Sequence, residues 1–214
     1  MKRLIVVFIL ALSSLSSFAA VCPSENSASQ ALWSKFTGIY SETVKQTPRG
    51  DVLVKYIGSL RMTYFRGQVP AEVGIAVAQD AKSFDEMVLG LYAQSSNHAS
   101  NLQSNLISLG DCIKGIRPSC SSAFSRVEDH AYMTFASLRE VVDSGHYARH
   151  RYNDFAVILN QVIQNGRVFP EEASSDAMNG GAHFYFSGRS KDAWLAEQLS
   201  IRQSLDAELT NCLK

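Results

Sequence analysis

The sequence predicts an all-α protein: a single-domain bundle of about six helices, braced by disulfide bonds, with one aromatic and glycine-rich loop before the last helix. Three observations carry this prediction. Apolar residues recur at three- and four-residue spacing in six segments, as in helices that bury one face. The alternating pattern of a half-buried strand is almost absent. Four cysteines, an even number, accompany an N-terminal segment that resembles a secretory signal.

Residues 1–19 have the composition of a secretory signal peptide. Lys2 and Arg3 precede an apolar run over residues 4–12, and Ser17-Phe18-Ala19 fits the small-x-small cleavage pattern. The run is far shorter than the ~20 residues that cross a bilayer, and no later stretch reaches that length. We therefore expect a periplasmic or secreted protein, cleaved near Ala19, with residues 20–214 forming one helical domain without a transmembrane segment.

The six expected helices can be placed from their start and stop signals. Ser27 and Gln30 have the spacing of a capping box, which begins the first helix. Pro70 suits the first turn of the third and longest helix, in which small polar residues over 94–104 predict a break or kink. The expected helices cover approximately residues 27–46, 51–66, 70–109, 121–144, 146–164 and 194–212.

The helical pattern lapses between Arg167 and Arg189. Asn179-Gly180-Gly181 is typical of a helix stop, and His183-Phe184-Tyr185-Phe186 is a group of aromatic side chains among glycines. Pro170-Glu171-Glu172 can start a short turn of helix that these glycines stop, and we expect a loop after it. If the aromatic segment is extended, Phe184 and Phe186 point one way and His183 and Tyr185 the other. Rigid aromatic side chains on such a loop suit insertion into a partner's cleft. The interpretation that we favour is that Phe184 and Phe186 fold back as a lid over the core, with His183 and Tyr185 remaining outside.

A tight turn is expected between Cys112 and Cys120, because glycine and proline lie between them. In an exported chain, four cysteines favour two disulfides over metal ligands or catalytic thiols. The short spacing favours pairing Cys112 with Cys120, which leaves Cys22 for Cys212. Three pairings are possible, and the alternatives, such as Cys22 with Cys112 and Cys120 with Cys212, would interlock the two halves of the chain.

Charge and motifs exclude several classes of function. The formal net charge is zero, and removal of Lys2 and Arg3 would make it about −2, whereas proteins that bind nucleic acid usually carry a basic excess. The sequence has no Gly-x-Ser-x-Gly elbow, no phosphate-binding Gly-Lys loop and no Ser-x-x-Lys motif. We expect no nucleic-acid partner, no cofactor and no catalytic or metal site.

Residues 146–151 form the densest basic stretch of the chain and suit an acidic partner or an anionic ligand. His146 and His150 also have the i, i+4 spacing of a pair that can bind a divalent metal, with His183 as a further donor. Arg149 and Arg151 would repel a cation there, and the stretch lacks the glutamate of a His-Glu-x-x-His motif.

The sequence therefore predicts an exported helical domain that binds another protein, for example an inhibitor or immunity-type protein or an envelope adaptor. The alternative is an envelope hydrolase or metal-dependent enzyme that uses the three histidines. The expected partner-binding residues are His146, Arg149, His150, Arg151, His183, Tyr185 and Phe186.

Overall fold

The computed structural model describes residues 21–214, so the predicted signal peptide lies outside the described residues. Residues 21–214 contain helices and no strand, which confirms the all-α prediction. The elements are α1 (Pro23–Gln46), α2 (Pro48–Tyr64), α3 (Ala71–Ile116), the 3-10 turn η1 (Pro118–Cys120), α4 (Ser121–Gln164), α5 (Glu171–Arg189) and α6 (Lys191–Leu213).

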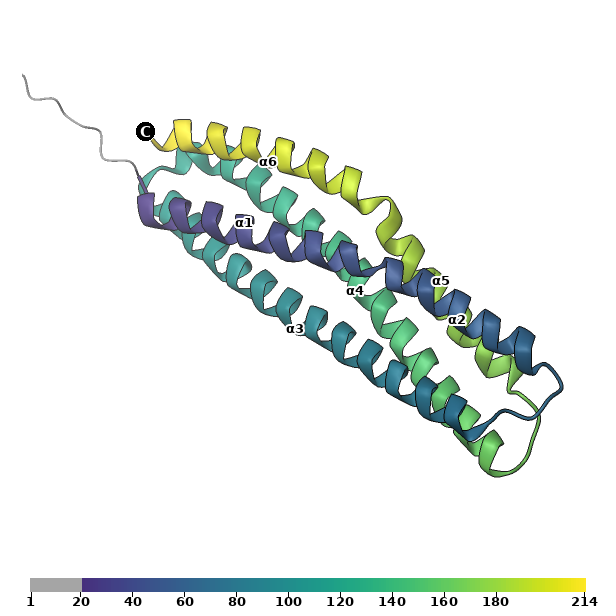
Figure 1. Ribbon diagram of the computed structural model, residues 1–214. Coiled ribbons are helices and arrows are strands. Elements are labelled where there is room, and N and C mark those ends of the chain that lie inside the picture. Colours follow the sequence, from purple (N-terminus) through teal and green to yellow (C-terminus); the bar gives the residue numbers. More distant parts are fainter. Residues whose placement is uncertain (1–20) are drawn as a thin grey trace, which may run out of the picture.

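The helices form a bundle of four rods, not the expected six (Figure 1). α2 follows α1 after the single residue Thr47, and α6 follows α5 after Ser190, so each pair makes one rod. α3 and α4 are antiparallel and run the length of the bundle. α1 and α6 cover them at the end that holds the C-terminus, and α2 and α5 lie at the other end.

Two expected interruptions are absent because the apolar face continues through them. α3 shows no break over residues 94–104, since Leu91 and Leu102 stay in helical phase and both are buried. Gly145 was expected to end a helix but lies inside α4, which joins the fourth and fifth expected helices. Its backbone packs against the ring of Phe184, where a β-carbon would be only 3.1 Å from the ring.

The expected aromatic and glycine-rich loop is wrong, because residues 171–189 form α5. Gly180 and Gly181 do not stop this helix; they let it approach its neighbours. A β-carbon on Gly181 would lie 2.8 Å from the carbonyl oxygen of Gly50 in α2, and one on Gly180 would lie 3.0 Å from Cα of Ala148 in α4. Glycine allows backbones to come this close.

The expected Cys112–Cys120 and Cys22–Cys212 pairing is also wrong. The disulfides are Cys22–Cys112 and Cys120–Cys212, which is the interlocking alternative. α3 continues past Gly115 to Ile116, so Cys112 is a helical residue and not part of a tight turn. The two bridges tie the start of α1 and the end of α6 to the connection between α3 and α4.

The core is rich in aromatic side chains and extends through both ends of the bundle. Phe36 and Tyr40 of α1, Phe155 of α4 and Phe184 of α5 are almost fully buried. Edge-on ring contacts link Phe84 of α3 to both Tyr152 and Phe184. Within residues 21–214, no helix has an apolar stretch long enough to cross a membrane.

Candidate functional site

The seven predicted partner-binding residues lie on α4 and α5, but they do not form one patch. His146 and Arg149 face α3. The His146 ring lies edge-on to Tyr92, with centroids 4.6 Å apart, and Arg149 forms an ion pair with Asp85. Arg149 Nε also donates a hydrogen bond to His146 Nδ1 over 3.1 Å. These two residues therefore connect α4 to α3.

The surroundings of His146 disfavour its protonation. Burial is the main cause that lowers its pKa, and the nearby charges of Arg149 and His150 act in the same direction. The carboxylates of Asp143 and Asp85 oppose this effect but do not reverse it. The predicted basic stretch presents less positive charge than its sequence indicates, because Arg149 is paired with Asp85.

On the opposite side of α4, Tyr147 and Arg151 face α5. The Arg151 guanidinium lies 5.2 Å from the centroid of the Tyr147 ring, and its Nη1 is 3.8 Å from Asp176 Oδ2. The His183 ring is edge-on to Tyr147 with centroids 6.1 Å apart. His183 is exposed. Tyr147 thus contacts both a cation and an imidazole at the surface between the two helices.

The helical form of α5 changes which aromatic side chains are accessible. Phe184 is buried, as expected for a side chain that folds over the core, whereas Phe186 is 58% exposed and does not. The two rings therefore point in different directions, unlike residues i and i+2 of an extended strand. His183 and Phe186 are three residues apart and share the exposed side of α5. Tyr185 lies between this side and α2, half-buried, with its ring centroid 5.2 Å from that of Phe186.

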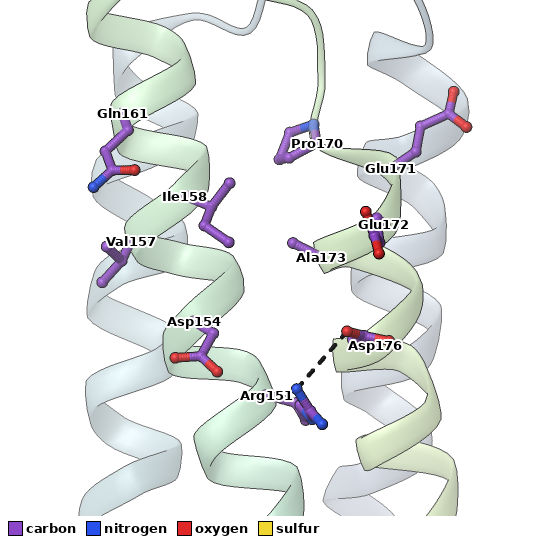
Figure 2. Close-up of a pocket in the computed structure, with 10 residues that line it drawn as sticks. All are labelled: Arg151, Asp154, Val157, Ile158, Gln161, Pro170, Glu171, Glu172, Ala173 and Asp176. Atoms are coloured by element: carbon purple, nitrogen blue, oxygen red, sulfur yellow. Dashed lines mark ion pairs between the residues drawn. The ribbon is translucent and has the colours of Figure 1, made fainter.

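A groove of about 570 Å³ continues this surface along α4 and α5 (Figure 2). Ile158 points from α4 toward α5, where Pro170 and Ala173 lie opposite it. Carboxylates surround this apolar strip, and one of them, Asp176, is paired with Arg151. The lining residues are Arg151, Asp154, Val157, Ile158, Gln161, Pro170, Glu171, Glu172, Ala173 and Asp176.

Two of the groove carboxylates form no ion pair within the described chain. Glu171 points away from α4 toward α2, where its Oε2 is 3.6 Å from Arg61. Within the described chain, Asp154 and Glu172 are in no ion pair within 4.0 Å. Four carboxylates and a single cation, Arg151, line the groove, which therefore combines exposed apolar surface with an excess of negative charge. We call the groove together with Tyr147, His183 and Phe186 the α4/α5 face.

Most of the groove was not found from the sequence. One signal was present: Val157 is an apolar residue outside the stripe that Phe155, Ile158 and Leu159 form at three- and four-residue spacing. Val157 is 57% exposed, and its neighbour Ile158, at the edge of that stripe, is 38% exposed. The other wall comes from α5, where the sequence pattern indicated a loop, so helical periodicity gave no register of α5 against α4.

The three histidines do not converge. His146 faces Tyr92 on the α3 side, and His183 faces Tyr147 on the α5 side. The centroids of the His146 and His150 rings are 6.3 Å apart. Residues 21–214 contain no group of three or more histidine, cysteine, aspartate or glutamate side chains placed to hold a metal ion. This arrangement gives no support to the alternative that uses His146, His150 and His183 as a metal cluster.

Known proteins do not supply a family or an activity for this chain. Comparison with family models, with curated proteins and with solved structures gives no match. The α4/α5 face, with its exposed aromatic side chains beside an acidic, partly apolar groove, is therefore what the chain offers for assigning a function.

Proposed function

We propose that the chain is an exported helical domain that binds another protein through the α4/α5 face, as an inhibitor, an immunity-type protein or an envelope adaptor does. The observation that carries this proposal is the groove, in which exposed Val157 and Ile158 lie beside unpaired carboxylates. Binding of a partner that covers apolar side chains on the outside of a helix is favourable, because it removes apolar surface from water.

The chemistry of the groove favours a partner segment that is both apolar and cationic. Asp154 and Glu172 would attract lysine or arginine side chains, while Ile158 and Ala173 would contact apolar ones. Tyr147 and Phe186 extend the contact area beyond the groove, and aromatic residues often dominate the binding energy of an interface. A cationic amphipathic helix has both properties and could lie along the groove.

Export is supported by the cysteines. The disulfides Cys22–Cys112 and Cys120–Cys212 account for all four cysteines of the sequence. Disulfides that brace a fold form and persist in oxidising compartments. This agrees with the signal-peptide features of residues 1–19.

Site-specific photo-crosslinking in the native host would test the proposal. A benzoylphenylalanine replaces Tyr147, Ile158 or Phe186 in turn, and the covalent adducts are separated and identified. We expect the same partner to be crosslinked from all three positions. Ile75 and Ile107 of α3 are matched controls, because they are exposed and apolar but lie outside the α4/α5 face. Equal adducts from the control positions would contradict the proposal.

A charge-reversed variant tests the chemistry of the partner separately. Asp154→Lys with Glu172→Lys should strongly reduce adduct formation from Phe186, since both changes repel a cationic segment. The matched control is Glu42→Lys with Glu86→Lys, which reverses two exposed carboxylates on α1 and α3. If the groove variant crosslinks as efficiently as the control, the partner segment is not cationic.

A further inference from the structure

A second groove, of about 480 Å³, lies on the other side of α4, between α4 and α3. We call it the aromatic groove. α3 contributes Tyr92, Ser95, Ser96, Ala99 and Gln103, and α4 contributes Tyr132, Phe135, Leu138, Arg139, Val142 and Asp143, with Phe36 of α1 between them. It shares no lining residue with the groove between α4 and α5.

The aromatic walls of this groove are held by contacts within the protein. The Phe135 ring is edge-on to Phe36, with centroids 4.8 Å apart, and edge-on to Tyr132 at 5.9 Å. Tyr92 is fixed on the opposite wall by its edge-on contact with His146. Tyr92 and Tyr132 are nevertheless 46% and 40% exposed. The walls are thus preformed and leave aromatic surface accessible for a ring-containing molecule.

Ser95 supplies one polar group to this largely apolar groove. It is 6% exposed, and its hydroxyl has no hydrogen-bond partner in the protein. Every other buried serine or threonine of residues 21–214 has a partner, in most cases a carbonyl three or four residues earlier in its helix. A buried hydroxyl without a partner is unfavourable, so Ser95 is placed to gain from a ligand that pairs with it.

The charges at the rim cancel. Arg139 Nε lies 3.4 Å from Asp143 Oδ2, one turn along α4, and no other charged residue lines the groove. A charged ligand would therefore find no opposite charge free to receive it, while an uncharged one loses less hydration on entry. The volume is within the range of small-molecule sites.

We propose that the aromatic groove binds a small uncharged molecule with a ring-containing apolar body and one hydrogen-bonding group that pairs with Ser95 Oγ. This site is independent of the partner surface proposed above. The ring body lies between Tyr92 and Phe135, and Leu138 and Val142 contact its edge. The polar group of the ligand satisfies the hydroxyl that the protein leaves without a partner.

Fluorescence titration with N-phenyl-1-naphthylamine tests this proposal, because the probe is uncharged, has aromatic rings and carries a single N–H group. We expect saturable enhancement with one probe per chain. Ser95→Ala should weaken binding about five- to tenfold, the value of one hydrogen bond. Ala99→Trp, which fills the groove, should abolish binding. Ser108→Ala is the matched control, since it removes a hydroxyl from an exposed position of the same helix.

Circular dichroism establishes that each variant is folded before the titration. Absence of saturable binding to the wild-type protein would overturn the proposal. Binding that survives in Ala99→Trp would place the probe elsewhere and also overturn it, and unchanged affinity in Ser95→Ala would remove the assigned hydrogen bond. If light scattering finds a wild-type dimer that Ala99→Trp converts to a monomer, a second copy covers the groove and the small-molecule assignment is wrong.

Discussion

Arg202 Nε donates a hydrogen bond to Asp206 Oδ1 over 2.8 Å, and the Arg202 side chain is almost completely buried in the bundle. Its guanidinium lies 4.5 Å from the centroid of the Trp33 ring, and Nη2 is 3.3 Å from Ser29 Oγ. Burial lowers the pKa of Arg202, while the Asp206 carboxylate acts in the opposite direction. A positive charge at the contact between α1 and α6 therefore depends on a single carboxylate.

Removing that carboxylate should destabilise the protein more than removing the whole pair. Asp206→Asn leaves the buried charge of Arg202 uncompensated, and we expect a loss on the order of 3 kcal/mol in the free energy of unfolding. Arg202→Met combined with Asp206→Asn should recover part of this loss. Urea unfolding measures the free energy of unfolding of the single and the double variant. Asp143→Asn, which breaks the exposed pair with Arg139, is the control and should cost less than about 1 kcal/mol. Equal effects of the two single changes would contradict this account.

Stability should fall in mild acid because of two histidines. Burial is the main cause that lowers the pKa of His130, and the charge of Arg202 adds to it; the pKa of His146 is also lowered, mainly by burial. Below the ordinary value of 6.5, the unfolded chain binds protons that the folded chain does not. The free energy of unfolding should therefore fall as the pH drops through that value.

Urea midpoints measured between about pH 8 and about pH 5 check this expectation. His130→Gln and His146→Gln should each make the pH dependence shallower, whatever their effect on stability at neutral pH. His183→Gln removes an exposed histidine and serves as the control. If the pH dependence of the double variant His130→Gln with His146→Gln equals that of the wild-type protein, these two histidines are not its source.

Local sequence patterns predicted the helices well where burial alone decides. Leu91, Leu102 and Leu106 keep the 3.6-residue period, and all are buried in α3. The same logic failed at Gly180 and Gly181, because a glycine that stops a helix and one that allows close packing look alike in sequence. Only the contact with α2 and α4 distinguishes them.

The candidate site shows the same limit. Tyr147 and Arg151 were within the predicted basic stretch. Their neighbours Asp176 and His183 come from α5, of which the sequence predicted at most a short turn that ends before His183. The charge of Arg149 was expected at the surface, yet it is paired with Asp85 of α3. The neighbours of Tyr147 and Arg151 and the ion pair of Arg149 all depend on contacts between segments far apart in the sequence. Helical periodicity carries no information about such contacts.

The glycines at the crossing of α2 and α5 should be intolerant of side chains. A β-carbon on Gly181 would be 2.8 Å from the backbone oxygen of Gly50, and one on Gly50 would be 2.9 Å from the Tyr185 nitrogen. The atom that the new β-carbon would meet belongs to the backbone of α2, which cannot move aside as a flexible side chain can. Gly181→Ala should therefore lower the free energy of unfolding by about 3 kcal/mol.

Gly90→Ala is the matched control for this crossing. Gly90 is an exposed residue of α3 with nothing near its β-carbon position, so alanine there should stabilise the protein by about 0.5–1 kcal/mol. Thermal unfolding followed by circular dichroism measures both changes. If Gly181→Ala is as stable as Gly90→Ala, the two helices do not cross at these glycines.

The interlocking disulfides can be distinguished from the pairing that the sequence favours by non-reducing peptide mapping. Trypsin cleaves after Lys114, which separates Cys112 from Cys120. We expect the peptide containing Cys120 to be linked to residues 203–214, and the one containing Cys112 to be linked to the N-terminal peptide. A link between the Cys112 and Cys120 peptides would contradict the structure.

Each bridge should also contribute substantially to stability, because each closes a long loop. The paired cysteines are 90 and 92 residues apart, and loop-closure entropy then gives about 4–5 kcal/mol per bridge. A Cys112–Cys120 bridge would close a far shorter loop and contribute about 2.5 kcal/mol. Urea unfolding of Cys22→Ser with Cys112→Ser, and of Cys120→Ser with Cys212→Ser, should therefore show large and similar losses. Under the Cys112–Cys120 and Cys22–Cys212 pairing, each double variant would instead break both bridges and leave two free thiols. Free thiols detected in either double variant would therefore contradict the pairing of the structure.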